Sequence, residues 1–268
     1  MSVVVSKSYL LSPEAVFPLN HGRIGYQSFA ADRSAADVTV SSAQDSFPAD
    51  APLRPDTFEK WKPDGAGSWQ VDLGQPRDVD YVGVLGELAG VALEVEYSVD
   101  GDNWERFASD TLPVDDSPLM FIDEVYARYF RITGQSQFAL ASVYIGNLLV
   151  MQRPFFGGHS PVSLSRQTDM RASMSRGGHF LGQDIVRQGV SGSMRWENLR
   201  PGWYRENFDP FVRAFRTRPA FIAWNLRDRP REVIYAWSDD DISPTNVARF
   251  VGGAMEVSIN IRGVGHND

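Results

Sequence analysis

Short stretches of alternating polar and apolar residues follow one another between residues 68 and 150, and they constrain the fold more than any other feature. In residues 68–74, tryptophan, valine and leucine alternate with Gln70 and Asp72, and a glycine ends the run. Successive side chains of a β-strand point to opposite faces, so such a stretch predicts a strand with one buried face. Several short strands at this spacing predict an all-β sandwich. The other stretches with this character are residues 80–85, 91–98, 127–133 and 141–150.

The second half of the chain also has β-strand patterns, but it contains one helix signal. Residues 255–261 alternate cleanly, and residues 220–224 and 232–237 are apolar runs typical of core strands. Asp209 followed by Pro210 is typical of a helix start, with aspartate as the N-cap and proline at the first helical position. This half therefore predicts a second β-rich domain with one inserted helix near residues 203–217.

The whole chain is expected to form three parts, because 268 residues fit two domains better than one. Residues 1–30 are expected to be an N-terminal lead-in, residues 31–150 the β-sandwich and residues 151–268 the second domain. The proline and two glycines in residues 154–158 predict a hinge between the domains.

Composition excludes several classes of site. The sequence has no cysteine, so disulfides, thiolate nucleophiles and sulfur-based zinc sites are excluded. Its four histidines are far apart and have no metal-binding spacing, so neither a metal nor a cofactor is expected. No apolar run is long enough to cross a bilayer, and the first residues do not have the order of a signal peptide. We therefore expect no membrane insertion, and synthesis in the cytosol.

Charge is divided unevenly between the two halves. Residues 1–150 hold 10 Lys and Arg against 22 Asp and Glu, whereas residues 151–268 hold 16 against 12, and all 16 are arginine. Arginine is common at protein interfaces. No dense basic patch is present, so nucleic acid binding is not expected.

The sequence gives no indication of an enzyme. The densest acidic run is Asp239, Asp240 and Asp241, and three adjacent carboxylates in a turn are more often solvated than catalytic. A catalytic pair needs surroundings that separate the pKa values of its two carboxyl groups. None of the common hydrolase or phosphate-loop motifs is present. We therefore expect a non-enzymatic protein.

Four motifs in fixed order in the first half point to a family. Trp61 follows Asp56 and Thr57, and then come residues 69–74, residues 95–104 with their Asp-Gly turn, and residues 127–132. This series, over about 100 residues, resembles the discoidin or coagulation-factor C-type domain family, which is galactose-binding-like. The resemblance implies a jelly-roll β-sandwich. Many members hold a structural calcium, but residues 142–146 lack the late glutamate of that site, so no metal is expected here.

The same resemblance implies a ligand site. In this family, loops at one end of the sandwich bind sugars, lipids or proteins, and the corresponding aromatic side chains here could stack on a sugar. The alternative is that these rings cover the end of the sandwich or contact another subunit. The candidate ligand-binding residues are Tyr26, Phe29, Phe58 and Trp61.

A second resemblance covers residues 203–263. The apolar runs there look like C-terminal parts of minor tail proteins of long-tailed bacteriophages, of the distal tail type. The resemblance implies a structural component of a tail tip or baseplate, located in the virion, assembled in the host cytoplasm and in contact with other tail proteins. Its sandwich would then bind host surface carbohydrate or a neighbouring tail protein. The alternative is a stand-alone, lectin-like carbohydrate-binding module.

The second domain is also expected to drive homo-oligomerisation, with a ring as the expected form. It concentrates aromatic residues and arginines, the types enriched at the centres of interfaces. The alternative is a single aromatic-rich core with its arginines in solvent. The candidate assembly residues are Trp203, Tyr204, Phe208, Arg213 and Arg216.

Overall fold

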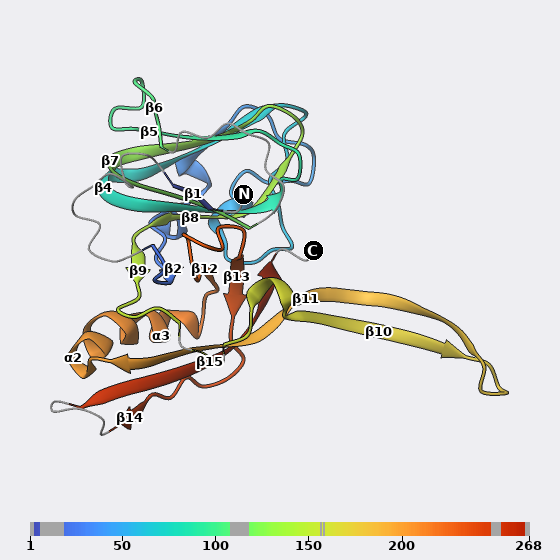
Figure 1. Cartoon of the computed structure of the whole chain (residues 1–268). Helices are drawn as coiled ribbons and strands as arrows, with labels where there is room; N and C mark the ends of the chain where they lie inside the picture. Colours follow the sequence, from blue (N-terminus) through green and yellow to red (C-terminus); the bar gives the residue numbers. More distant parts are fainter. Residues whose placement is uncertain are drawn as a thin grey trace.

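The computed structural model describes residues 3–5, 19–107, 118–155, 157, 159–247 and 253–265. In this part of the chain, two β-sheets and one helical segment are stacked, with a β-sandwich above the second domain and a two-stranded arm that extends to one side (Figure 1). The predicted fold class, all-β with one inserted helix, is confirmed.

The sandwich is one seven-stranded sheet folded into two layers. The first half of β4 pairs with β3 and with the end of β7, whereas its second half pairs with β8 and with the start of β7. A register shift between Asp72 and Arg77 marks the passage of β4 from one layer to the other. The strands are β1 (Val3–Val5), β3 (Val38–Val40), β4 (Gly67–Glu87), β5 (Leu93–Ser98), β6 (Glu105–Arg106), β7 (Leu119–Gly134) and β8 (Ala139–Gly146).

The alternation in residues 69–73 works as predicted. Trp69, Val71 and Leu73 are buried in the core between the two layers. Asp72 points outward and accepts two hydrogen bonds of 2.7 Å from Arg128 of β7. These bonds hold the pKa of Asp72 below its ordinary value. The outer face of β4 is therefore joined to its neighbouring strand by an ion pair.

The second domain is an eight-stranded sheet covered on one side by the helical segment. Its strand order is β10-β11-β15-β13-β12-β2-β9, and β14 pairs with β15. The strands are β2 (Arg23–Gly25), β9 (Leu148–Val150), β10 (Arg166–Met174), β11 (Phe180–Leu199), β12 (Ala220–Ala223), β13 (Val233–Trp237), β14 (Thr245–Val247) and β15 (Ala254–Gly265). The single-turn 3-10 helices of the described residues are η1 (Ala30–Asp32), η2 (Ala35–Asp37), η3 (Ala51–Leu53) and η4 (Val162–Leu164).

The helical segment begins earlier than predicted. It runs without a break through α2 (Pro201–Trp203), the π-helical turn η5 (Tyr204–Phe208) and α3 (Asp209–Phe215). Pro201 occupies the first turn, where its missing N–H costs nothing. Asp209 is therefore not an N-cap; it lies inside the segment and pairs with Arg213. Pro210 cannot donate a backbone hydrogen bond, and the π-helical turn ends two residues before it.

The predicted boundaries between the three parts differ from the structure. The lead-in supplies strands to both sheets, because β1 pairs with β7 and β2 lies between β12 and β9. β9 lies inside the predicted sandwich range, yet it belongs to the second sheet. The predicted hinge is anchored at Phe155, whose ring lies 4.6 Å from that of Trp196. Phe156 and Gly158 lie outside the described residues.

The two domains share a buried apolar interface. All eight residues of β8 are buried, because one face of the strand packs in the sandwich core and the other on β12 and β13. The rings of Tyr144, Phe221 and Tyr235 meet there with centroids 4.8–5.9 Å apart. The hydroxyl of Tyr144 donates to the carbonyl of Pro219 at 3.1 Å. With its polar atoms paired and its apolar atoms packed, this interface joins the domains into one body.

Asp80 is partly buried where the sandwich meets β9. Its carboxylate accepts a 2.7 Å hydrogen bond from the backbone N–H of Leu148. The pKa of Asp80 is raised to about 7: burial is the largest cause and Glu124 adds to the rise, whereas the backbone bond and Arg23 oppose it. Because the pKa is higher in the folded chain than in the unfolded one, the fold loses stability as pH rises from about 4 to about 7.

We expect Asp80→Asn to be more stable than the parent chain at pH 8, by up to about 4 kcal/mol. Asparagine keeps the acceptor for Leu148 and removes the buried charge. Urea unfolding at pH 4 and pH 8 measures the effect, and the difference between the two proteins should shrink toward pH 4. An equal pH dependence in both would contradict this assignment.

Candidate functional site: the Phe58 loop

One aromatic side chain of the sandwich stands in solvent at the end of an otherwise anchored loop. The loop comprises residues 54–61, between η3 and β4, and is called the Phe58 loop. The side chain of Phe58 is 91% exposed, whereas the residues that bound the loop, Leu53 and Trp61, are buried. A ring this exposed gains almost nothing from folding, so it is available to contact another molecule.

The C-terminal end of the loop is fixed by Trp61. Its backbone exchanges two hydrogen bonds with Leu140 of β8, at 2.8 and 2.9 Å. Its indole N–H donates to the carbonyl of Ser42 at 3.0 Å, and its ring packs edge-on against Phe138. Trp61 is fully buried, so it holds the loop from inside the core.

The N-terminal end is fixed by two hydroxyl groups. Ser142 of β8 donates to the carbonyl of Arg54 at 3.0 Å. Tyr235 of β13 donates to the carbonyl of Pro55 at 2.6 Å, so the second domain also holds the loop. Within the loop, the backbone N–H of Glu59 donates to Asp56 at 3.3 Å. The loop is therefore ordered before any ligand arrives.

Charged side chains lie on the same loop as the exposed ring. Arg54 pairs with Asp50 at 2.8 Å and also with Glu59, and Lys60 pairs with Glu87 at 2.7 Å. All of these side chains are at least partly exposed, so their donors and acceptors can also reach a bound group. An apolar ring within a polar rim can stack on the apolar face of a ligand while the rim binds its hydroxyls.

The structure does not bring the four predicted ligand residues together. Trp61 is in the core, so the prediction that it contacts a ligand is wrong. Phe29 is half-buried against the sandwich core, with Arg77 stacked over its ring at 4.7 Å. Tyr26 packs on Phe211 of α3, with ring centroids 5.5 Å apart. Of the four, only Phe58 is mostly exposed.

The predicted assembly residues also fall into two groups, aromatic residues in the core and exposed arginines. Tyr204 and Phe208 are buried in the core beneath the helical segment, and Trp203 packs partly on Phe208. These aromatics stabilise the domain itself, as the alternative of a single aromatic core expected. Arg213 and Arg216 are exposed. The five residues therefore do not form one surface.

Each carboxylate of the acidic run at residues 239–241 has a polar partner. Asp239 pairs with Arg262 at 3.1 Å, Asp240 accepts a 2.9 Å hydrogen bond from Asn260, and Asp241 lies 3.6 Å from Arg216. In the parts of the chain that the structure describes, no three His, Cys, Asp or Glu side chains are grouped to hold a metal ion.

None of the described helices is long and apolar enough to cross a membrane.

The first half of the chain matches the model of a known protein family. The model of the F5/8 type C domain matches residues 37–144, which lie within the sandwich. The N-terminal half therefore contains a discoidin-like β-sandwich domain, and the fold expected from the sequence resemblance is confirmed. No curated protein matches the chain.

Several solved structures are similar to part of the chain. Chitosan-binding module 1 of a chitosanase/glucanase from Paenibacillus sp. IK-5 is 18% identical, with 45% of this chain and 98% of that one covered and a TM-score of 0.40. CpGH89CBM32-6 of Clostridium perfringens is 15% identical, with 43% and 96% covered and a TM-score of 0.37. A pectin-binding carbohydrate-binding module is 17% identical, with 41% and 88% covered and a TM-score of 0.37.

Proposed function

We propose that this chain is a non-enzymatic structural component of a bacteriophage tail tip or baseplate. In this proposal its discoidin-like domain presents the Phe58 loop to a host surface glycan or to a neighbouring tail protein. The observation that carries the binding role is the exposed ring of Phe58 on a loop whose two ends are fixed in buried structure.

The anchored loop suits binding for an energetic reason. Ordering a flexible loop on binding costs free energy, and here folding has already supplied that order. A phenylalanine ring offers a large apolar contact with few rotatable bonds. The charged rim adds donors and acceptors that orient a polar ligand. A small number of loop contacts can therefore give specific binding.

The way in which the sandwich is joined to the second domain supports the structural role. It is joined to the second domain through the interface around Phe221, and Tyr235 of that domain helps to hold the Phe58 loop. The binding loop is thus oriented by the domain beneath it, as a part of a larger assembly requires. The resemblance of residues 203–263 to tail proteins adds the virion context. A stand-alone, lectin-like module is the second candidate, favoured by the exposed ring within its polar rim.

We expect Phe58→Ala to weaken ligand binding about 10- to 100-fold, as the loss of a central aromatic contact typically does. A glycan array of bacterial surface polysaccharide fragments, followed by titration of any positive fragment, measures the change. Val99→Ala, another exposed apolar substitution on the sandwich, is the control and should bind as the parent does. Equal binding by the parent and Phe58→Ala would remove the Phe58 loop from the site.

The virion role is tested separately from the ligand. Gold-labelled antibodies against the chain should mark one end of the tail in electron micrographs of the phage particles that encode it. Labelling that is absent from the particles, with the protein free in the lysate, would favour the stand-alone module.

A further inference from the structure

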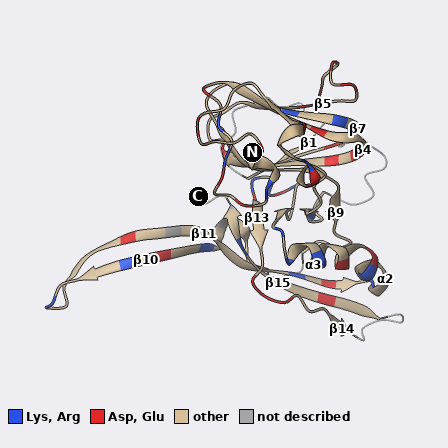
Figure 2. Cartoon of the chain, turned by 180° about the vertical axis from the view of Figure 1, so that it is seen from behind, with Lys and Arg blue, Asp and Glu red and all other residues tan. Residues whose placement is uncertain are grey.

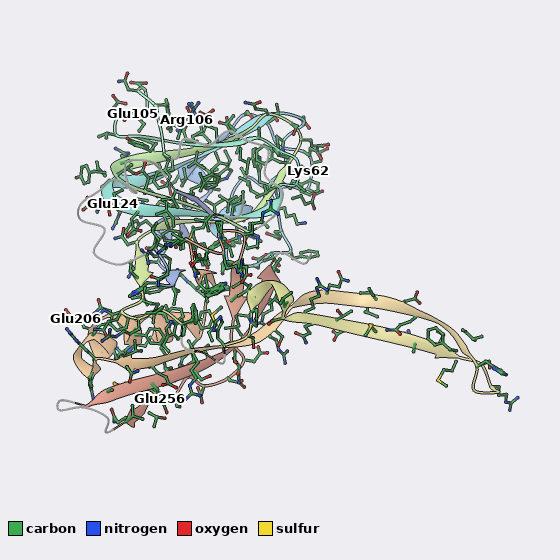
Figure 3. All side chains as sticks on the ribbon, in the orientation of Figure 1. Lys62, Glu105, Arg106, Glu124, Glu206 and Glu256 are labelled. Carbon is green, nitrogen blue, oxygen red and sulfur yellow. The ribbon has the colours of Figure 1, made fainter. Side chains whose placement is uncertain are left out.

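Three buried hydroxyl groups meet next to the Phe58 loop, where the sandwich contacts the second domain. Ser142 and Tyr144 belong to β8 of the sandwich, and Tyr235 belongs to β13 of the second sheet. All three residues are at most 2% exposed. The hydroxyl of Tyr235 lies 3.4 Å from that of Tyr144 and 3.5 Å from that of Ser142, so the three groups form one cluster. Side chains of both domains fill the space between the sandwich and the second sheet (Figure 3).

The Tyr235 hydroxyl has one proton, and the distances show where it goes. The carbonyl oxygen of Pro55 lies 2.6 Å away, much nearer than the hydroxyl of Tyr144 at 3.4 Å. Hydrogen bonds between a hydroxyl and an oxygen are usually about 2.7–2.8 Å long, so Tyr235 donates to the loop. Burial raises the pKa of Tyr235 above its ordinary value, so the hydroxyl keeps the proton that it donates.

The other two hydroxyls donate in different directions. Ser142 donates to the carbonyl of Arg54 at 3.0 Å, so the sandwich also holds the loop. Tyr144 donates to the carbonyl of Pro219 at 3.1 Å, which lies in the second domain directly before β12. The interface therefore contains two buried tyrosine hydroxyls, and of these two only that of Tyr235 donates to the Phe58 loop.

The chain is stiff at the point where these hydroxyls hold it. Arg54 is extended, with φ −92° and ψ 152°, as is usual for a residue before a proline. The ring of Pro55 fixes its own φ. The carbonyls of both residues are bonded, so the direction in which the chain leaves toward Phe58, three positions after Pro55, is set. The Tyr235 hydroxyl therefore acts on the position of Phe58 through the backbone.

Tyr235 is itself held in place by the second sheet. Its strand is bonded on both sides, with Tyr235 opposite Phe221 of β12 and Val264 of β15. A strand whose two edges are paired cannot shift without its neighbours. β13 holds no charged residue and is tan along its length in Figure 2, and Tyr235 carries its only hydroxyl. The second domain therefore sets the position of this donor.

We propose that Tyr235 is a positioning residue for the ligand site, through which the second domain sets the ligand affinity of the Phe58 loop. This inference rests on the proposed function and adds that the two domains act as one binding unit. Order that exists before binding lowers the free-energy cost of binding, so a buried hydroxyl that holds the loop contributes to affinity. The coupling is reciprocal, so a bound ligand in turn stabilises the bond between Tyr235 and Pro55.

The first test follows the loop in the full chain without any ligand. Because the chain has no cysteine, Phe58→Cys provides a single site for a nitroxide spin label, whose mobility electron paramagnetic resonance measures. In this labelled chain, Tyr235→Phe keeps the buried ring and removes only the hydroxyl. The loss of one buried hydrogen bond should increase the mobile fraction of the label about 3- to 10-fold.

Tyr144→Phe is the matched control for the label. It removes a hydroxyl from the same interface and leaves the bond from Tyr235 to Pro55 in place, so the mobile fraction should not change. Urea unfolding verifies that both variants are folded. Equal label mobility in the parent and Tyr235→Phe would overturn the proposal. An equal increase in both tyrosine variants would also overturn it, because this would indicate a general loosening of the interface.

The second test measures binding by unlabelled proteins. The polysaccharide fragment that the parent binds on the glycan array is titrated into the parent and the two tyrosine variants. We expect Tyr235→Phe to bind about 3- to 10-fold more weakly and Tyr144→Phe to bind as the parent does. In the Phe58→Ala background, Tyr235→Phe should have little further effect, because the ring that it positions is absent. An unchanged affinity of Tyr235→Phe would contradict the proposal.

The two tests separate this inference from the proposed function. A parent chain that binds no fragment would contradict the ligand role of the loop, whereas the spin label would still show whether Tyr235 positions it. A parent that binds, with no effect of Tyr235→Phe on mobility or affinity, would retain the ligand site and remove Tyr235 from it.

Discussion

Replacing Phe221 with alanine should lower the free energy of unfolding by about 3–5 kcal/mol, the usual cost of deleting a fully buried phenylalanine ring. Phe221 is fully buried and packs against Tyr144 of the sandwich and Tyr235 of the second sheet. The loss should therefore affect both domains together. Urea unfolding followed by tryptophan fluorescence and by circular dichroism should give one shared, weakened transition.

A second substitution shows whether the ring acts through the domain interface. At Gly83 of β4, an added methyl group would lie 2.6 Å from the ring of Phe221, so Gly83→Ala forces the ring to move. We expect Gly83→Ala to be destabilising in the parent chain and nearly neutral in the Phe221→Ala background, because the obstacle is then gone. Additive effects in this cycle would show that Gly83 and Phe221 do not meet.

Replacing Trp61 with alanine should also cost about 3–5 kcal/mol of unfolding free energy. The substitution empties a buried site and leaves the carbonyl of Ser42 without its indole donor. Phe58→Ala, three positions earlier in the same loop, should change stability by less than about 0.5 kcal/mol, because its ring is in solvent. Thermal unfolding of the two variants side by side measures the contrast.

The comparison also separates two roles for Trp61. If Trp61 were a ligand contact, its removal would weaken binding without a large loss of stability. As an anchor, its removal should lower the melting temperature and weaken binding together. The more conservative Trp61→Phe should recover part of both. A stable Trp61→Ala variant with a selective binding defect would contradict the anchoring role.

Much of the architecture could be predicted from local patterns. The alternation around Trp69 and Val71 assigned the inner face of β4 correctly, because a strand with one buried face leaves a period of two in the sequence. The helical segment was also expected near its true position, since Phe211 and Phe215 lie on one helical face. Its start at Pro201 was missed, because the aspartate–proline pair at residues 209–210 has the same composition as a helix start.

The candidate site was harder to predict, because burial depends on contacts between distant residues. Phe58 and Trp61 lie three residues apart in the same loop, and nothing local distinguishes them. Their difference arises from Leu140, which pairs with the backbone of Trp61 from 79 positions away in sequence. The arm shows the same limit. The strands of residues 166–189 pair with each other, but only the fold shows that their described side chains are exposed or only partly buried.

The antiparallel pairing of β2 with β9 bears on how such a protein can diversify. These two strands are neighbours in the second sheet, with Arg23 opposite Val150 and Gly25 opposite Leu148, and the sandwich lies between them in the chain. The discoidin-like domain is thus an insertion whose entry and exit points are adjacent. Apart from β1, it could be exchanged for another recognition domain without changing the strand order beneath it. The same platform could in this way carry different specificities, provided that each replacement covers Phe221 and Tyr235.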